Sequence, residues 1–312
     1  MARFSLPGAI AAMSLLLVAC EEPAEDKPDG ERREPVVVYA AFEDDARLQG
    51  LFARFTEETG TFVIVRRGAP QDIVTDLMEN RVSPPADMLM TNSVVDIWRA
   101  AEEGALRPIA SEIVANRSPG WSRDADGLWA GIGFRRAVIV YDEATVSVDE
   151  SLDYASLQQP RFGGKLCLSS SGNAINRTVI AMLIDALGVR PAEIVVRGWM
   201  KNLAMPVFDS EHQVVQAVES GACGIGIVSS SVAATSNLSV HSPSSPFVDV
   251  DGIGIGRHAR NPDGASALLN WLFDELPEAH FEAIDEADQR NVSLVAWYQE
   301  DAIRLAERAH YR

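Results

Sequence analysis

The sequence is poor in lysine, cysteine and tyrosine, and it has no excess of basic residues. Of its 312 residues, only three are lysines and three are cysteines, and the formal net charge is −18. A nucleic-acid partner would need a basic face, so this charge balance argues against one. The three cysteines form no cluster that could hold a metal. The apolar share, 47%, is ordinary and is ample for a core in a chain of this length.

A long apolar run is also missing. The stretch from Leu6 to Ala19 is apolar, but spanning a bilayer takes roughly 20 apolar residues. With Arg3 ahead of it, this start predicts a secretory signal over residues 1–20. Its end, Leu17-Val18-Ala19-Cys20, resembles a bacterial lipobox, in which Cys20 becomes the lipidated N-terminus. An ordinary signal peptide with a chance cysteine is the alternative.

Residues 21–34 follow without any apolar run, so they cannot contribute to a core. We expect a disordered tether that holds a soluble, extracytoplasmic domain at a bacterial membrane. Cys167 and Cys223 remain in that domain. An even pair outside the cytoplasm predicts a disulfide, and two buried thiols are the alternative.

Strand and helix patterns alternate from residue 35 onward. Apolar, β-branched stretches alternate with segments whose apolar residues recur at helical spacing. This order predicts a parallel sheet covered by helices. Ligands of such sheets bind beyond the carboxyl ends of the strands. Here those ends are at 41–43, 67–68 and 91–93.

A second α/β unit begins near residue 127, and the apolar segment 247–256 is typical of a chain that crosses back to the first unit. We therefore expect an α/β fold of two lobes with a hinge between them. The first lobe is predicted at 35–134 and 246–285, and the second lobe at 135–245 and 286–312.

Two serine clusters follow predicted strands of the second lobe. One is Ser169-Ser170-Ser171-Gly172-Asn173, directly before a helix, and the other is Ser229-Ser230-Ser231. Backbone N–H groups at a helix start, with hydroxyls nearby, can bind an anion. Simple helix capping is the alternative. If the two clusters face one cleft, they form a binding site for a small oxyanion.

Arg135 and Arg136 precede a predicted strand, and one of them could face the same cleft. An arginine there would neutralise the charge of an anionic ligand, and we expect Arg135 to do so. A solvated surface arginine is the alternative.

No catalytic motif is visible. The five histidines are scattered without zinc-site spacing. A nucleophile elbow, a P-loop and a serine–lysine pair are absent, and the segment 252–256, GIGIG, lacks the helix that a dinucleotide loop needs. We therefore expect no catalytic residue, and an enzyme is the least expected class.

Several stretches together resemble a known family, the ferric-iron-binding periplasmic solute-binding proteins of ABC importers, which have the type II periplasmic binding fold. The resemblance covers nearly the whole chain after the tether. It rests on VVVYAAFEDD, PPADMLMTN, GLWAGIGFRRAVIVYD, KLCLSSSGNAINRTVIAMLI, QAVESGACGIGIVSSS and GIGIGRHARNPDGASALLNWL. The positions of Cys167 and Cys223 match a branch of the family that has a disulfide there.

The resemblance also implies where iron ligands would lie, and here the chain departs from the family. Adjacent tyrosines would stand at Ser230 to Ala233, and another at Ile175. An acid or histidine would lie near Glu43 and an acid near Asn92. None of the five tyrosines stands at a matching position. We therefore expect no resident metal, although ferric iron stays open through the resemblance.

These observations predict a lipid-anchored, monomeric solute-binding protein that delivers a small solute to an ABC permease. The solute would be an anion or an iron chelate, bound at an iron site that has lost its ligands. The alternative is an envelope lipoprotein that uses the fold to dock a protein partner. The candidate ligand-binding residues are Glu43, Asn92, Arg135, Ser169, Ser170, Ser171, Asn173, Ser229, Ser230 and Ser231.

Overall fold

A computed structural model describes residues 33–41, 46–68, 70–79, 85–244, 247–276 and 292–312. The predicted signal segment, the lipidation site Cys20, nearly all of the tether and the candidate Glu43 lie outside these residues. The chain divides into two units, 1–32 and 33–312, and the description concerns the second. Among the described residues, no helix is long and apolar enough to cross a membrane.

The first part of the chain forms the predicted parallel strands. Strand β1 (Val36–Ala41) lies between β2 (Val63–Arg67) and β3 (Met88–Thr91), and it is parallel to both. Strand β1 is fully apolar apart from Tyr39, as expected for a strand covered on both faces. The helices that alternate with these strands are α1 (Ala46–Thr59), α2 (Pro70–Glu79) and α3 (Val94–Glu102).

The chain then returns to this sheet from far along the sequence. Strand β9 (Val248–Gly256) is antiparallel to β3 and to the first half of β5 (Ala130–Tyr141), and the two-residue strand β4 (Leu106–Arg107) also pairs with it. The pairing of β5 with β9 shifts register between Gly131 and Gly133. Two further helices, α4 (Glu112–Arg117) and α9 (Pro262–Glu275), pack against each other.

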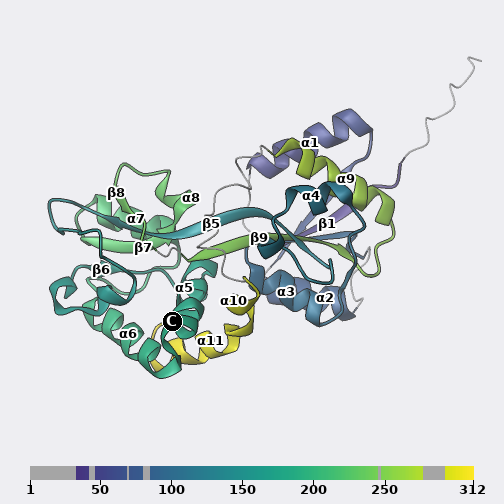
Figure 1. The fold of residues 1–312 in the computed structure, drawn as a ribbon. Coiled ribbons are helices and arrows are strands. Elements are labelled where there is room, and N and C mark those ends of the chain that lie inside the picture. Colours follow the sequence, from purple (N-terminus) through teal and green to yellow (C-terminus); the bar gives the residue numbers. More distant parts are fainter. Residues whose placement is uncertain (1–32, 42–45, 69, 80–84, 245–246, 277–291) are drawn as a thin grey trace, which may run out of the picture. The chain divides into compact units, whose positions relative to one another are not determined.

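Strand β5 also belongs to a second sheet. Its residues up to Arg136 pair with β9, and its residues from Ala137 onward pair with β7 (Ile225–Ser229). Strand β8 (Ser239–His241) lies on the other side of β5, and β6 (Leu166–Cys167) is parallel to β7. Figure 1 shows β5 as one long ribbon that runs from one sheet into the other. The change of partner between Arg136 and Ala137 is therefore the point where the two sheets join.

Helices of the second lobe cover this second sheet. They are α5 (Ala174–Leu187), α6 (Val189–Asn202), α7 (Glu211–Glu219) and the short α8 (Ser230–Ala233). Short 3-10 helices occur in the described residues at Gly120–Ser122, Ala155–Gln158 and Pro160–Phe162. The disulfide predicted from the sequence is confirmed: Cys167 and Cys223 are bonded, with 6.0 Å between their Cα atoms, and both are buried.

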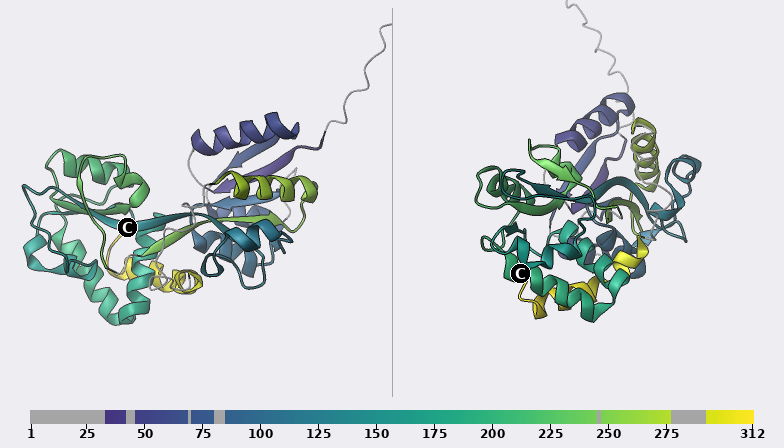
Figure 2. Two further views of the ribbon diagram at one scale, coloured as in Figure 1. Left: turned by 45° about the horizontal axis from the view of Figure 1, so that its top comes forward. Right: turned by 60° about the vertical axis from the view of Figure 1, so that its left-hand side comes forward.

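The C-terminal residues form two helices, α10 (Ser293–Trp297) and α11 (Gln299–Arg308), with a turn at Tyr298. Helix α10 packs against both α3 and α5. Helix α11 packs against α5 and α6, and both views of Figure 2 show it beside them. The C-terminal residues thus add a third connection between the two lobes, besides β5 and β9.

Candidate functional site

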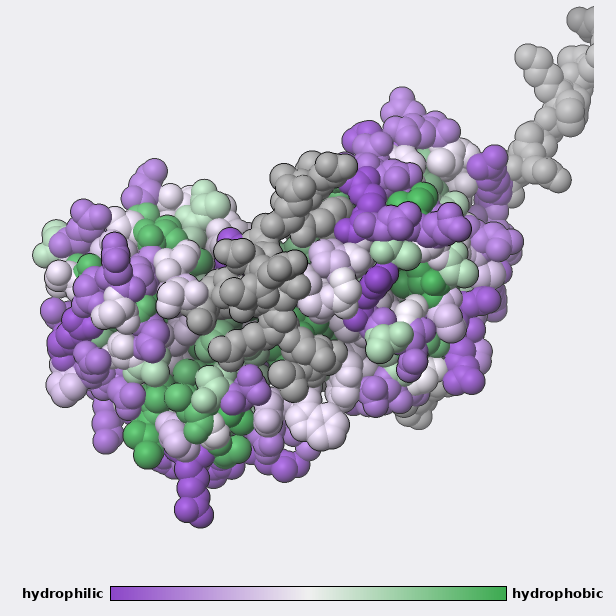
Figure 3. Space-filling model, viewed as in Figure 1, coloured by the Kyte–Doolittle hydropathy of each residue, from purple (hydrophilic) through white to green (hydrophobic). Residues whose placement is uncertain are grey.

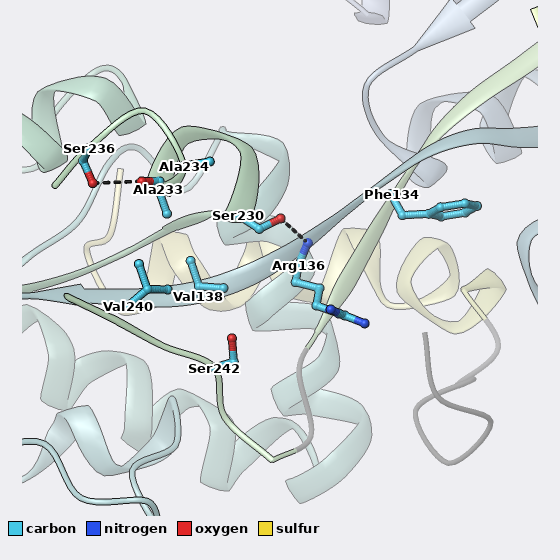
Figure 4. Close-up of a pocket in the computed structure, with 9 residues that line it drawn as sticks. All are labelled: Phe134, Arg136, Val138, Ser230, Ala233, Ala234, Ser236, Val240 and Ser242. Atoms are coloured by element: carbon cyan, nitrogen blue, oxygen red, sulfur yellow. Dashed lines mark hydrogen bonds between the residues drawn. The ribbon is translucent and has the colours of Figure 1, made fainter. Parts of the chain in front are cut away.

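A cavity of about 430 Å³ lies along the second half of β5. It is closed on one side by α8 and on another by β8 and the residues that follow it. Its lining residues come from these three elements and are shown in Figure 4: Phe134, Arg136, Val138, Ser230, Ala233, Ala234, Ser236, Val240 and Ser242.

Three of these residues alternate along β5. Phe134, Arg136 and Val138 are separated by one residue each, so they lie on one face of the strand. Arg135 lies on the opposite face. The two arginines that the sequence places side by side therefore have separate surroundings.

Arg136 is held beside the cavity through its backbone. Its N–H group donates to the Ser230 hydroxyl oxygen at 3.2 Å, which ties α8 to β5 (Figure 4). The Nε atom of its guanidinium is buried and has no hydrogen-bond partner in the part of the chain that the structure describes. A buried donor without a partner is costly, and a bound acceptor would remove that cost.

Arg135, in contrast, is engaged by protein groups. Its Nη2 atom lies 2.9 Å from Asp251 Oδ1 and 3.8 Å from Asp249 Oδ2, and it donates to the Asn92 carbonyl oxygen. Burial lowers the pKa of Arg135, but Asp251, Asp249 and Glu211 together raise it above its ordinary value. Arg135 thus links β5 to β9 and to the loop after β3.

The first serine cluster forms bonds within the protein. Ser169 is fully buried; its carbonyl oxygen accepts from the Tyr311 hydroxyl at 2.7 Å and its hydroxyl from Asn176 Nδ2 at 2.8 Å. The Ser170 hydroxyl accepts from Gly172 N–H, and the Ser171 hydroxyl donates to the Tyr311 carbonyl oxygen. Asn173 is the N-cap of α5, and its amide donates to the Asp209 carbonyl oxygen. None of these residues lines the cavity.

The second cluster is divided between the core and the cavity. Ser229 is buried, and its N–H group donates to Glu211 Oε2 at 2.5 Å. The hydroxyls of Ser229 and Ser231 are 3.2 Å apart. Ser230 lines the cavity. The structure therefore brings one candidate from the sequence, Ser230, into the cavity, and it places Asn92 at Arg135 and outside the cavity lining.

Four lining residues, Arg136, Phe134, Ser236 and Ser242, are not among the ligand-binding residues predicted from the sequence. Arg136 could have been found, because it stands beside Arg135 before the same predicted strand. The other three occur as isolated residues in apolar or small-residue segments, where no pattern marks them.

Among the residues that the structure describes, no side chain in the cavity lining is an ordinary ligand of ferric iron: none is a tyrosine, histidine, cysteine or carboxylate. Tyr39, Tyr154 and Tyr311 are buried in the core, and Tyr141 and Tyr298 pack at its edge. Among the described residues, no group of three histidines, cysteines or carboxylates could hold a metal ion.

Comparison with known proteins was made through sequence and through structure. No family model matches the chain. Iron uptake protein A1 of Synechocystis is 28% identical over 287 residues, covering 85% of this chain and 79% of that protein. The Fe(3+)-binding periplasmic protein of Serratia marcescens is 22% identical over 254 residues, covering 76% of this chain and 73% of that protein.

Solved structures give the same result. A structure of FutA (IdiA) from Trichodesmium, in complex with iron and citrate ligands, has a TM-score of 0.77 and 27% identity, and the match covers 89% of this chain and all of that one. The apo ferric ion-binding protein A of Pasteurella haemolytica has a TM-score of 0.81 and 20% identity, with coverage of 89% and 98%. The homologues and structural neighbours of this chain are thus ferric-iron-binding periplasmic proteins, and its own fold is their two-lobed α/β fold, the type II periplasmic binding fold.

Proposed function

We propose that this protein is an extracytoplasmic solute-binding protein that captures a small solute, an anion or an iron chelate, in the cavity along β5. It then presents the solute to an ABC permease. The observation that carries the proposal is the cavity itself, where Arg136 and Ser230 lie on the fold of iron-uptake proteins. Its volume, about 430 Å³, is in the range of small-molecule sites.

The position of the cavity supports capture between two hinged lobes. Phe134 and Arg136 lie on the part of β5 that pairs with β9, and the other lining residues lie on or beside the second sheet. The cavity thus lies next to the point where β5 changes partner, between Arg136 and Ala137. Rotation about this point would open and close the site, as in other two-lobed binding proteins.

We propose further that bare ferric iron is not the cargo. Fe³⁺ is a hard trivalent ion and needs anionic oxygen ligands, and the cavity lining offers neutral hydroxyls and one guanidinium. An iron chelate differs, because its chelator supplies those ligands. The described part of the lining has no tyrosine or carboxylate side chain, which supports this loss of the iron site. For the other sequence candidates, including Glu43, a ligand-binding role stays a prediction.

The chain would act by binding and not by catalysis, in keeping with relatives that are binding and uptake proteins. We also propose that Cys20 carries the lipid anchor, that the tether places the domain in the periplasm or outside the cell, and that the protein works as a monomer.

The experiment is a binding titration of the purified domain, residues 33–312, with ferric citrate, citrate and inorganic phosphate. A ligand that binds only the native state raises the unfolding midpoint, and calorimetry gives its Kd. We expect at least one of the three to bind. A phenolate-to-iron absorption band on addition of ferric citrate would contradict the lost iron site. No binding of any probe would contradict solute capture.

Docking of a protein partner is the second candidate function. It is favoured by an apolar area over α6, which Figure 3 shows on a face that is otherwise mostly hydrophilic. Leu187, Val189 and Ile194 are exposed there, Ile194 to 64%. Exposed apolar patches often mark protein contacts. Cross-linking to a protein that is lost on Ile194→Glu, in a chain that binds no solute, would favour docking over transport.

A further inference from the structure

We infer that Arg136 is the group that recognises the solute, and that it does so by binding an oxyanion, a carboxylate or a phosphate, at the end of a molecule with an apolar body. This inference rests on the proposed function and specifies its ligand. It also makes Arg136, and not Arg135, the residue that sets the charge of the solute.

The described lining of the cavity carries a positive charge. Among the described residues, Arg136 is the single charged residue in the lining, and the other polar groups there are serine hydroxyls. A fixed positive charge in a small cavity attracts an anion and repels a bare trivalent cation. The sign of the ligand is therefore set by one residue.

Two other largely buried arginines have ion-pair partners: Arg135 is paired with Asp251 and Asp249, and Arg177 with Asp96. No ion pair involves Arg136 within the described ranges. All three arginines have a buried Nε atom without a hydrogen bond, so the difference lies in the ion pairs. A guanidinium offers parallel donors that match the two oxygens of a carboxylate or phosphate.

Two serine hydroxyls that line the cavity differ in their hydrogen bonds. Ser230 accepts a hydrogen bond from the Arg136 N–H group, so its own proton is left for a ligand. Ser236 differs, because its hydroxyl already donates to the Ala233 carbonyl oxygen. Ser230 thus offers a second polar group on the α8 side, whereas Figure 4 shows the guanidinium of Arg136 directed away from Ser230, so the oxyanion is expected at the guanidinium.

The remaining lining residues indicate that the body of the solute is apolar. Phe134, Val138 and Val240 are apolar, and Ala233 and Ala234 leave space on the α8 side. Inorganic phosphate would fill little of about 430 Å³. We therefore expect an organic oxyanion to bind more tightly than inorganic phosphate, whether it arrives free or as the ligand of an iron chelate.

The test is calorimetry with citrate, ferric citrate and inorganic phosphate on four proteins: the wild type, Arg136→Gln, Arg136→Lys and Ser230→Ala. Arg304→Gln is the matched control, since it removes the same charge from an exposed position on α11. We expect Arg136→Gln to weaken the binding of citrate or ferric citrate at least tenfold and to abolish its dependence on salt. Arg136→Lys should retain part of the affinity and the salt dependence, because it keeps the charge and loses the two-oxygen geometry. Ser230→Ala should weaken binding several-fold, and Arg304→Gln should leave it unchanged.

The outcomes separate the two proposals. Binding of free citrate identifies the free anion as the source of the oxyanion, and binding of ferric citrate alone identifies the chelate. If circular dichroism shows that Arg136→Gln is folded, and this variant binds as tightly as Arg304→Gln, the role of Arg136 is overturned while solute capture stands. If the wild type binds none of the three probes, both proposals are contradicted.

Discussion

Arg177 of α5 and Asp96 of α3 form an ion pair that joins the two lobes, with 3.6 Å between Arg177 Nη2 and Asp96 Oδ2. Both side chains are almost completely buried, with 10% and 9% of their surface exposed. A carboxylate of β9 lies close by: Asp249 Oδ1 accepts from the Val94 N–H group at the start of α3. The α3–α5 contact therefore contains charges as well as apolar side chains.

Replacing Asp96 and replacing Arg177 should change the free energy of unfolding by different amounts. Asp96→Asn resembles the protonated carboxyl, which the raised pKa of Asp96 makes the favoured form in the fold, so we expect little or no loss in unfolding free energy. Arg177→Gln should cost more, because it removes the positive charge that favours the Asp96 carboxylate. The double variant should be close to the wild type. Urea unfolding at pH 7 measures all three.

Glu300→Gln in the exposed Arg304–Glu300 pair is the control, and it should leave stability unchanged. Equal losses for Asp96→Asn and Arg177→Gln would contradict the argument from protonation.

The same carboxyl should make stability depend on pH. Burial raises the pKa of Asp96 above its ordinary value; Arg177 and Arg99 oppose this rise and Asp249 adds to it. A raised pKa means that the folded state binds the proton more tightly than the unfolded state does. Below the pKa of the unfolded state, about 4, Asp96 is protonated in both states and does not change the stability of the protein. As the pH rises from there through the pKa of the folded state, the ionisation of Asp96 lowers the free energy of unfolding.

We therefore expect the Asp96→Asn, Arg177→Gln double variant to gain stability relative to the wild type between about pH 4 and the folded pKa of Asp96, and the difference to stay constant above it. Urea unfolding at intervals of half a pH unit gives the curve. A difference that stays flat over the whole range would show that Asp96 titrates alike in both states.

Asp87 should be one of the most sensitive positions in the first lobe. It is buried, and its carboxylate accepts three backbone hydrogen bonds, from Val37 at 2.8 Å, Arg260 at 2.7 Å and Asn261 at 2.8 Å. Asp87→Asn would turn an amide N–H₂ toward at least one of these donors. We expect a loss of about 3 kcal/mol, measured by chemical unfolding, whereas Asp126→Asn at an exposed position should have no effect.

The disulfide should add to the stability of the second lobe. Cys167 and Cys223 close a loop with a sequence separation of 56, and the chain-entropy treatment gives about 4 kcal/mol for a loop of this length. We expect Cys167→Ala, Cys223→Ala to lower the unfolding midpoint and to match the reduced wild type. A change below about 1 kcal/mol would mean that packing around the bond, and not chain connectivity, holds β6 to β7.

Much of the fold could be predicted from local patterns. The alternation of apolar strands and amphipathic helices gave the parallel strands β1 to β3, and the return of the chain at 247–256 is the strand β9. The disulfide followed from an even pair of cysteines in an extracytoplasmic domain. These inferences succeeded because they depend on spacing along the sequence.

The site was harder to predict, because its residues are selected by contacts between distant segments. The serines at 169–171 show the same sequence pattern whether they bind a ligand or other residues of the protein. Here Ser169 and Ser171 form hydrogen bonds with Tyr311, about 140 residues away. Likewise, neighbouring residues of a strand face opposite sides, so only the register of β5 shows which of Arg135 and Arg136 borders the cavity.

The alternation of faces along β5 is interrupted at one residue. Between Gly131 and Gly133 the pairing of β5 with β9 shifts register, and Ile132 is the extra residue of β5 at this point. An extra residue in a strand reverses which face each later side chain occupies. Deleting Ile132 would close the bulge and leave Arg135 opposite Asp249 and Arg136 opposite Val248. Simple alternation counted from Gly131 would assign both arginines to the wrong faces, so the bulge must be included before the later side chains of β5 are placed.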